Sequence, residues 1–254
     1  MSAREFDPGP PARFATLFAD CPPPTAFREH FWFEWGPVFY RGRLNGSARV
    51  LGIASDPGPT ERVVGRTLIG DAGQRVQGFL AKIGLDRSYV LANAFPYSFI
   101  PNHRKSARKI LTDPDQRQWR NRLYDALAGP ALEAIVAFGE YARIAVDEWS
   151  TAPAVPILRI PHPTSPGVTK LLDAWRPAVV ALRAQVTPDA GAPADLPYYG
   201  STFAESDYAA IPRRDLPFGV PAFVGNDAWV RAAGGHTSVS RPDPLTIEWV
   251  CPRP

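Results

Sequence analysis

Four short apolar runs stand out along the chain, each with the length of a single β-strand. They occupy residues 49–54, 89–94, 134–138 and 155–160 and are rich in Val, Ile, Leu and Ala. Such runs lack the alternation of a half-exposed strand, which indicates that both faces of each strand are buried. We therefore predict a parallel sheet that is covered by helices on both sides.

The segments between and after these runs have the pattern of amphipathic helices. In residues 73–85, apolar side chains recur at positions i, i+3, i+4 and i+7, which gathers them on one helical face. Residues 119–127, 139–149 and 169–186 are also expected to be helical. Alternating strands and helices predict a three-layer α/β/α fold around a central four-stranded parallel sheet.

The regular pattern ends near residue 186. Residues 187–197 are rich in Pro, Ala, Gly and Asp, as in a linker, and the rest of the chain is rich in aromatic residues, Gly and Pro. Short β-like runs occur at residues 222–224 and 245–250. We expect an α/β domain over residues 1–186 and an irregular, β-rich extension over residues 187–254 that packs on it.

Composition restricts the classes of protein and of site. Proline supplies 29 of the 254 residues, about twice the usual share of roughly 5%, which predicts long, stiff loops. Cys21 and Cys251 are the two cysteines, so a cysteine-ligated metal or iron-sulfur cluster is not expected, and no cofactor is implied.

The first 20 residues lack a continuous apolar stretch, so we expect neither a signal peptide nor a membrane anchor. A cytoplasmic monomer with free thiols is the expectation.

The charge of the chain is small but unevenly distributed. The formal net charge is +3, yet residues 1–186 carry 23 Lys and Arg against 17 Asp and Glu. Seven of these basic residues lie within residues 104–122. Such a run is consistent with contacts to nucleic-acid phosphates and equally with a solvated helix face.

Three polar side chains of different chemistry follow the predicted strands. Asp56 comes after the first strand, Asn93 ends the second, and His162 follows the fourth. Taken singly, each has an ordinary structural explanation, as a turn aspartate, a loop cap or a satisfied histidine. Their joint occurrence at three strand ends indicates a site, because the carboxyl ends of parallel strands meet at one edge of the sheet, where ligands of α/β folds bind.

The local motifs around these residues resemble those of the uracil-DNA glycosylase superfamily. Asp56-Pro57-Gly58 with Glu61, followed by the run GRTLIGDAG at residues 65–73, is similar to the first motif of the iron-sulfur branch. The runs VLAN at 90–93, IVAFG at 135–139 and HPT at 162–164 are similar to the later motifs. The likeness covers residues 49–185, and the cysteines that would hold the cluster are missing. An Asp-Pro pair is typical instead of the water-activating branch.

The resemblance implies a role for each residue of the expected site. Asp56 would stabilise a cationic sugar and orient water, His162 would donate to the departing base, and Asn93 would read the uracil edge. Phe95 is the expected base-stacking residue, because Leu68 replaces the usual phenylalanine; core packing is the alternative for Phe95. Further expected base contacts are Ser55, Gly58 and Gly70, and expected DNA contacts are Arg104, Lys105, Ser165 and Lys170.

The function predicted on this basis is base-excision DNA repair, with uracil-containing DNA as the partner. The enzyme would flip uracil out of the DNA and hydrolyse its N-glycosidic bond without a metal, which leaves an abasic site. Two alternatives remain open at this point. One is a nucleotide or nucleoside hydrolase on a similar sheet, and the other is a DNA-damage-binding protein that lacks turnover.

Overall fold

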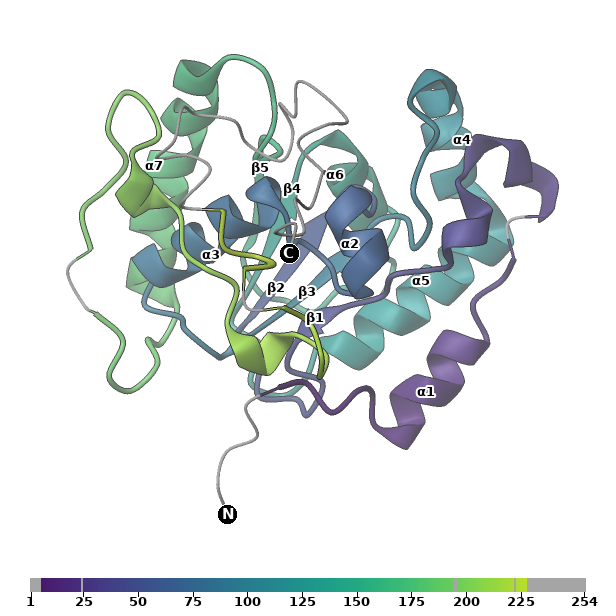
Figure 1. Ribbon diagram of the computed structural model, residues 1–254, viewed down its shortest axis with the longest axis horizontal. Helices are drawn as coiled ribbons and strands as arrows, with labels where there is room; N and C mark the ends of the chain where they lie inside the picture. The colour runs from purple at the N-terminus through teal and green to yellow at the C-terminus, as the bar shows by residue number, and fades with distance from the viewer. Residues whose placement is uncertain (1–5, 24, 194–195, 222, 228–254) are drawn as a thin grey trace, which may run out of the picture.

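The computed structural model describes residues 6–23, 25–193, 196–221 and 223–227 and has an α/β fold (Figure 1). Its strands are β1 (Arg41–Gly42), β2 (Val50–Ala54), β3 (Tyr89–Asn93), β4 (Ala134–Phe138) and β5 (Ile157–Ile160). They form one sheet in the order β1-β3-β2-β4-β5, in which β2 to β5 are parallel. The four strands predicted from the sequence are thus present in the structure.

The expectation of a purely parallel, four-stranded sheet is wrong in one respect, because β1 adds a fifth strand. It pairs antiparallel with β3, with Arg41 opposite Leu91 and Gly42 opposite Val90. This strand is two residues long and begins with an arginine, so it carries none of the apolar pattern by which the other strands were recognised.

Helices cover both faces of the sheet, as a three-layer fold requires. The α-helices are α1 (Ala12–Ala19), α2 (Pro59–Val64), α3 (Asp71–Lys82), α4 (Ala107–Thr112), α5 (Pro114–Leu127), α6 (Glu140–Asp147) and α7 (Val168–Gln185). Short 3₁₀ helices are formed by Thr25–His30, Phe33–Trp35, Pro101–Ser106, Glu205–Asp207 and Arg213–Asp215. Within the described part of the chain, no helix combines the length and hydropathy needed to cross a membrane.

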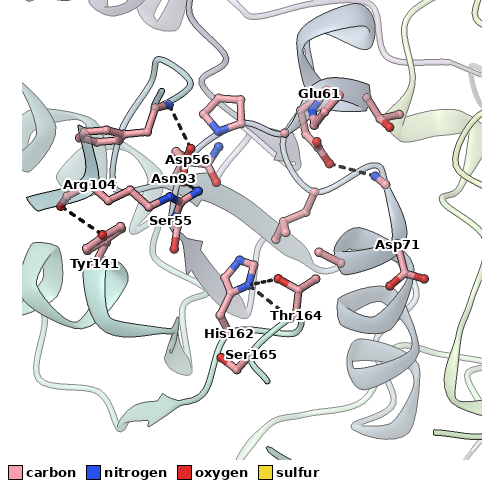
Figure 2. A pocket seen from close by; sticks show the side chains of 18 of the residues that line it. Ser55, Asp56, Glu61, Asp71, Asn93, Arg104, Tyr141, His162, Thr164 and Ser165 are labelled. Atoms are coloured by element: carbon pink, nitrogen blue, oxygen red, sulfur yellow. Dashed lines mark hydrogen bonds and ion pairs between the residues drawn. The ribbon is translucent and has the colours of Figure 1, made fainter. Parts of the chain in front are cut away.

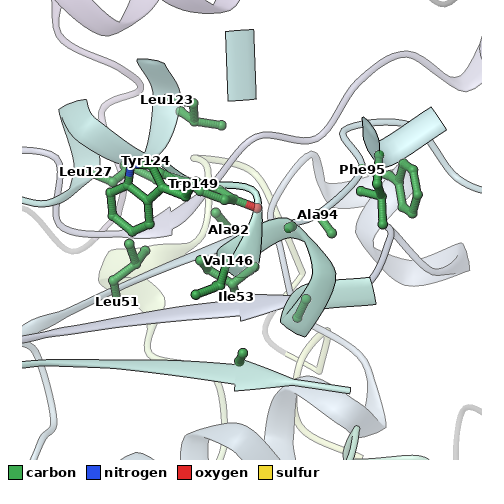
Figure 3. Packing of buried hydrophobic residues seen from close by; sticks show 14 of the residues in the cluster. Leu51, Ile53, Ala92, Ala94, Phe95, Leu123, Tyr124, Leu127, Val146 and Trp149 are labelled. Carbon is green, nitrogen blue, oxygen red and sulfur yellow. The ribbon is translucent and has the colours of Figure 1, made fainter. Parts of the chain in front are cut away.

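Alternate residues of the strands supply two hydrophobic cores. Leu51 and Ile53 of β2 belong to the core that α4, α5 and α6 cover, where Trp149 packs against the same cluster (Figure 3). Val50 and Ala54 point to the opposite face and pack in the core that α3 and α7 cover. This period of two is the reason why one short strand needs apolar residues at every position.

The order of the strands places a crevice beside β2. The chain passes from β2 through α3 to β3 on one side, whereas it passes from β4 through α6 to β5 on the other side. Because such crossovers are right-handed, α3 and α6 lie on opposite faces of the sheet. The connections therefore diverge between the carboxyl ends of β2 and β4, the position at which open α/β sheets bind ligands.

The described part of the extension packs on the domain, running beside α7 and α3 (Figure 1). Asp207 pairs with the buried Lys82 of α3 at 2.8 Å. Asp189 is buried, which opposes its ionisation, but the Ser88 hydroxyl and the backbone N–H groups of residues 86–88 donate to it and lower its pKa to about 2. These contacts fix the start of the extension to the loop before β3.

The extension was expected to be irregular and β-rich, and its described residues are irregular without being β-rich. Residues 187–193, 196–221 and 223–227 contain 3₁₀ turns and irregular backbone but no strand. Residues 223 and 224 of the first β-like run lie in a turn, while residue 222 and the second run, at 245–250, lie outside the described residues. The extension is held by buried acidic side chains and by single buried apolar residues such as Tyr199, Ile211 and Leu216.

A buried ion pair joins the extension to β1. The side chains of Arg41 and Asp215 are completely buried, with Arg41 Nη1 3.3 Å from Asp215 Oδ2. The Tyr89 hydroxyl donates to the same carboxylate oxygen at 2.6 Å, and Arg43 also pairs with Asp215. Arg41 Nη1 further donates to Gln77 of α3 at 2.8 Å. The Asp215 carboxylate thus binds side chains of β1 and β3 and that of Arg43, which directly follows β1.

Removing the Asp215 charge should therefore destabilise the fold. We expect Asp215→Asn to lower the free energy of unfolding by about 3–5 kcal/mol, since Arg41 is left buried without its counter-charge. Urea denaturation followed by circular dichroism measures this. The control is Asp173→Asn, which breaks an exposed pair with Arg176 and should cost about 1 kcal/mol or less. Equal losses in the two variants would contradict the structural role of the buried pair.

Candidate active site

A pocket of about 740 Å³ opens at the carboxyl ends of the parallel strands (Figure 2). Its volume is in the range of sites that enclose a small organic ligand or a nucleotide. Eight of the residues expected at the site line it, namely Ser55, Asp56, Gly58, Gly70, Asn93, Arg104, His162 and Ser165. The pocket therefore lies at the crevice that the strand order creates.

Asp56 enters this pocket from the loop after β2. Its side chain is 9% exposed. Oδ2 accepts a hydrogen bond from the Phe99 backbone N–H at 3.1 Å, and Oδ1 lies 3.8 Å from Arg104 Nη2. Burial raises the pKa of Asp56 above its ordinary value, while Arg104 and the Phe99 N–H partly oppose this shift. The carboxylate is thus oriented by the backbone and kept from full solvation.

His162 enters from the segment after β5, opposite Asp56 in Figure 2. Its Nδ1 lies 2.9 Å from the Thr164 hydroxyl and accepts from the Thr164 backbone N–H at 3.3 Å. A backbone N–H can only donate, so Nδ1 is unprotonated and the ring proton of the neutral form sits on Nε2. Burial, followed by the charges of Arg104 and Arg75, lowers the pKa of His162 to about 4. The imidazole is therefore neutral at physiological pH and presents an N–H donor.

Asn93, the last residue of β3, contributes a carboxamide to the pocket wall. The side chain is buried, and none of the described residues accepts a hydrogen bond from its amide nitrogen. A buried donor without a partner costs about 1–3 kcal/mol, which a ligand that accepts from it would offset. The backbone of Asn93 is held by the pairing of β3 and by Tyr124 of α5, whose hydroxyl donates to the Asn93 carbonyl at 3.2 Å. The free amide N–H is consistent with a ligand acceptor at this position.

Glu61 shapes the loop that carries Asp56. It is a buried residue of α2, and its Oε1 accepts from the backbone N–H groups of Ile69 at 2.7 Å and Gly70 at 2.9 Å. These bonds tie α2 to the start of α3. A Cβ on Gly58 would lie 2.6 Å from Glu61 Oε2, so a side chain at residue 58 would displace this carboxylate. Gly58 and Gly70 thus form the wall of the pocket as bare backbone.

Leu68 has a conformation that only the surrounding structure explains. It lines the pocket with a φ of 56°, in the left-handed region that costs a residue with a side chain about 1–2 kcal/mol. Its carbonyl lies against the first turn of α3, where a Cβ on Gly73 would come within 1.7 Å of the Leu68 oxygen. Such strain is typical of functional loops. The GRTLIGDAG run therefore needs glycine at residue 73 for this close approach.

Phe95 does not lie where base stacking was expected. It is buried, does not line the pocket, and packs edge-on against Phe99 and Tyr141, with ring centroids 4.6 and 5.8 Å apart. The stacking interpretation is therefore wrong, and the alternative of core packing fits the structure. The reason is a cluster of aromatic rings that also includes Phe31, which the local sequence around Asn93 does not show.

Two of the expected DNA-contacting residues lie outside the pocket, and three aromatic residues that were not expected line it. Lys105 and Lys170 are exposed and do not line it, so their contacts to DNA stay a prediction. Conversely, Trp32, Phe99 and Tyr141 line the pocket but were not recognised from the sequence. No motif surrounds them, and their positions depend on contacts between distant segments. Within the described ranges, no three His, Cys, Asp or Glu side chains are arranged to hold a metal ion.

Comparison with known proteins adds no assignment. No protein-family model matches the chain, and no curated protein is detectably similar to it in sequence. The likeness of the motifs to uracil-DNA glycosylases therefore rests on the residues themselves.

The electrostatic coupling of Arg104 to His162 can be tested directly. We expect His162 to titrate at a pKa of about 4, against an ordinary value of 6.5, and Arg104→Met to raise this pKa because a neighbouring positive charge is removed. Histidine ring resonances followed by NMR across pH give the value, with His162→Gln for assignment. Lys105→Met, one residue along the same 3₁₀ helix, serves as the control and should leave it unchanged. Titration of His162 near 6.5 in the parent protein would contradict the buried, neutral imidazole.

Proposed function

We propose that the protein is a DNA glycosylase that hydrolyses the N-glycosidic bond of uracil flipped out of DNA. One observation carries this proposal: a buried carboxylate, Asp56, and a neutral imidazole donor, His162, face one nucleotide-sized pocket from different strands. N-glycosidic cleavage develops positive charge on the sugar and negative charge on the departing base. A site with one group for each charge stabilises this transition state more than the ground state.

Asp56 would act on the sugar side of the bond. As the bond to the base breaks, its electron pair leaves with the base and C1′ becomes cationic. The carboxylate stabilises this cation and accepts the proton of the water molecule that attacks C1′. The Phe99 N–H holds one oxygen, and Arg104 favours the ionised form at 3.8 Å. Both contacts support a carboxylate that is fixed before substrate binds.

His162 would act on the base side. Its Nε2–H donates to the carbonyl oxygen of uracil that gathers negative charge. Because burial and nearby arginines lower its pKa to about 4, the ring is already the neutral donor at neutral pH and need not lose a proton first. Thr164 fixes the tautomer through Nδ1, as described above.

Asn93 would distinguish uracil from cytosine. Its unpartnered amide N–H can donate to O4 of uracil while the amide oxygen accepts from N3–H. Cytosine presents a donor at the first position and an acceptor at the second, so both contacts would be lost. The buried position of Asn93 at the end of β3 supports this reading role, since a fixed carboxamide discriminates better than a mobile one.

The test is the release of uracil from single- and double-stranded oligonucleotides in the presence of EDTA. We expect abasic product from the parent, roughly 10²–10⁴-fold slower product formation for Asp56→Asn, and roughly 10²–10³-fold slower formation for His162→Ala. Asp173→Asn, which alters an exposed carboxylate on α7, is the control and should retain the parental rate.

The same assay separates the alternative functions. A glycosylase acting on DNA should leave free deoxyuridine and dUMP intact. Hydrolysis of these small molecules at a rate similar to that of DNA would favour a nucleotide or nucleoside hydrolase. Binding of uracil-containing DNA without any abasic product from the parent would refute the enzymatic proposal and favour a damage-binding protein.

A further inference from the structure

Two exposed indole rings lie in the segment before β1. The side chains of Trp32 and Trp35 are 42% and 52% exposed, although tryptophan is usually largely buried. Trp32 also lines the proposed active-site pocket, which places its ring at the rim. Among the described residues, no other aromatic ring packs on the Trp32 indole, whereas Arg62 covers the Trp35 ring at 4.4 Å from its centroid. Trp32 therefore offers a free aromatic surface next to the pocket.

The position of Trp32 is fixed by the same segment that orients the catalytic carboxylate. Its backbone N–H donates to the Ser98 carbonyl at 2.9 Å, and the neighbouring residue Phe31 forms a β-bridge with Phe99. Phe99 in turn donates its N–H to Asp56. The indole is thus attached to a rigid support, so a ligand that stacks on it loses little of its binding energy to ordering the protein.

The charge at the rim matches a nucleic-acid strand. Arg104 lines the same pocket and is 49% exposed, so its guanidinium is accessible to a phosphate group as well as to Asp56. Proteins that bind single-stranded nucleic acids combine such cations with aromatic rings on which bases stack. In a duplex, by contrast, the bases next to a flipped nucleotide remain paired with the opposite strand inside the helix, which makes them less accessible to a rim indole.

We propose that Trp32 stacks on the unpaired base adjoining the flipped nucleotide, and that the protein consequently acts on single-stranded DNA in preference to duplex DNA. This inference rests on the proposed function. It names the strand form of the substrate and a binding contact outside the catalytic groups.

Affinity for a single-stranded 11-mer with one central uracil tests the contact. We measure it by fluorescence anisotropy in the Asp56→Asn background, so that no chemistry intervenes. Trp32→Ala should weaken binding roughly 10- to 100-fold, the loss of one stacked base. Trp32→Phe should recover most of the affinity, because it restores an aromatic face. Trp35→Ala is the matched control, a somewhat more exposed indole three residues away that does not line the pocket, and should change affinity less than twofold.

Removal of the neighbouring base identifies the stacking partner. A tetrahydrofuran abasic residue replaces the nucleotide on the 5′ or the 3′ side of the uracil. We expect one of these oligonucleotides to bind the Trp32-containing protein 10- to 100-fold more weakly, with no further loss in Trp32→Ala. If Trp32→Ala weakens binding by the same factor whether or not either neighbouring base is present, or has no effect, the stacking proposal is overturned.

Strand preference and turnover distinguish failure of this inference from failure of the proposed function. In the otherwise unaltered protein, Trp32→Ala should slow uracil release from single-stranded DNA at least 10-fold more than release from duplex DNA. Uracil release without the base-dependent effect of Trp32 would refute only the stacking contact. A base-dependent effect of Trp32 without any uracil release would support the stacking contact and refute the glycosylase.

Discussion

The central position of β2 is the constraint on which the rest of the site depends. Strands β3 and β4 flank it with parallel pairing and β5 pairs parallel with β4, so the residues after all four strands emerge at one edge. Connections leave β2 and β4 in opposite directions, which keeps helices from closing over this edge. The sheet therefore brings three side chains that are far apart in sequence to one pocket. They are the carboxylate of Asp56, the carboxamide of Asn93 and the imidazole of His162.

Burial and one arginine then adjust the charges of the pocket in opposite directions. Burial raises the pKa of Asp56 and lowers that of His162, and thus disfavours the charged form of each. Arg104 counters the first shift and strengthens the second. Its guanidinium favours an ionised Asp56 while disfavouring a protonated His162. Arg104 thus favours the anionic form of Asp56 and the neutral form of His162, and Arg75 adds to its effect on His162.

The sequence predicts those parts of the molecule that follow from local pattern. Continuous apolar runs gave the four parallel strands, and the polar residues at their ends gave Asp56, Asn93 and His162 as pocket residues. β1 could not be predicted in this way, because the buried Arg41 is paired with remote residues, above all with Asp215, 174 residues further along the chain. Likewise, the Phe31–Phe99 bridge brings Trp32 to the rim, and no local pattern encodes that approach.

Phe95 illustrates the same limit inside the site. Its place two residues after Asn93 is compatible with the pocket or with the core, and the outcome depends on rings contributed by distant segments. The extension is a larger example, since buried acidic side chains and apolar side chains such as Tyr199 and Ile211 attach its described part to remote segments of the domain. Prediction failed wherever a contact between remote residues decided the direction of a side chain.

The role of Asp56 opposite a cationic sugar is tested most directly with a transition-state mimic. An oligonucleotide in which a protonated pyrrolidine replaces the deoxyribose of the flipped nucleotide is compared with one that carries neutral tetrahydrofuran, in the presence of free uracil. The parent protein should bind the cationic oligonucleotide at least about a hundredfold more tightly than the neutral one, and Asp56→Asn should lose most of this difference. Equal affinity of the parent protein for the two oligonucleotides would contradict a site built to stabilise N-glycosidic cleavage.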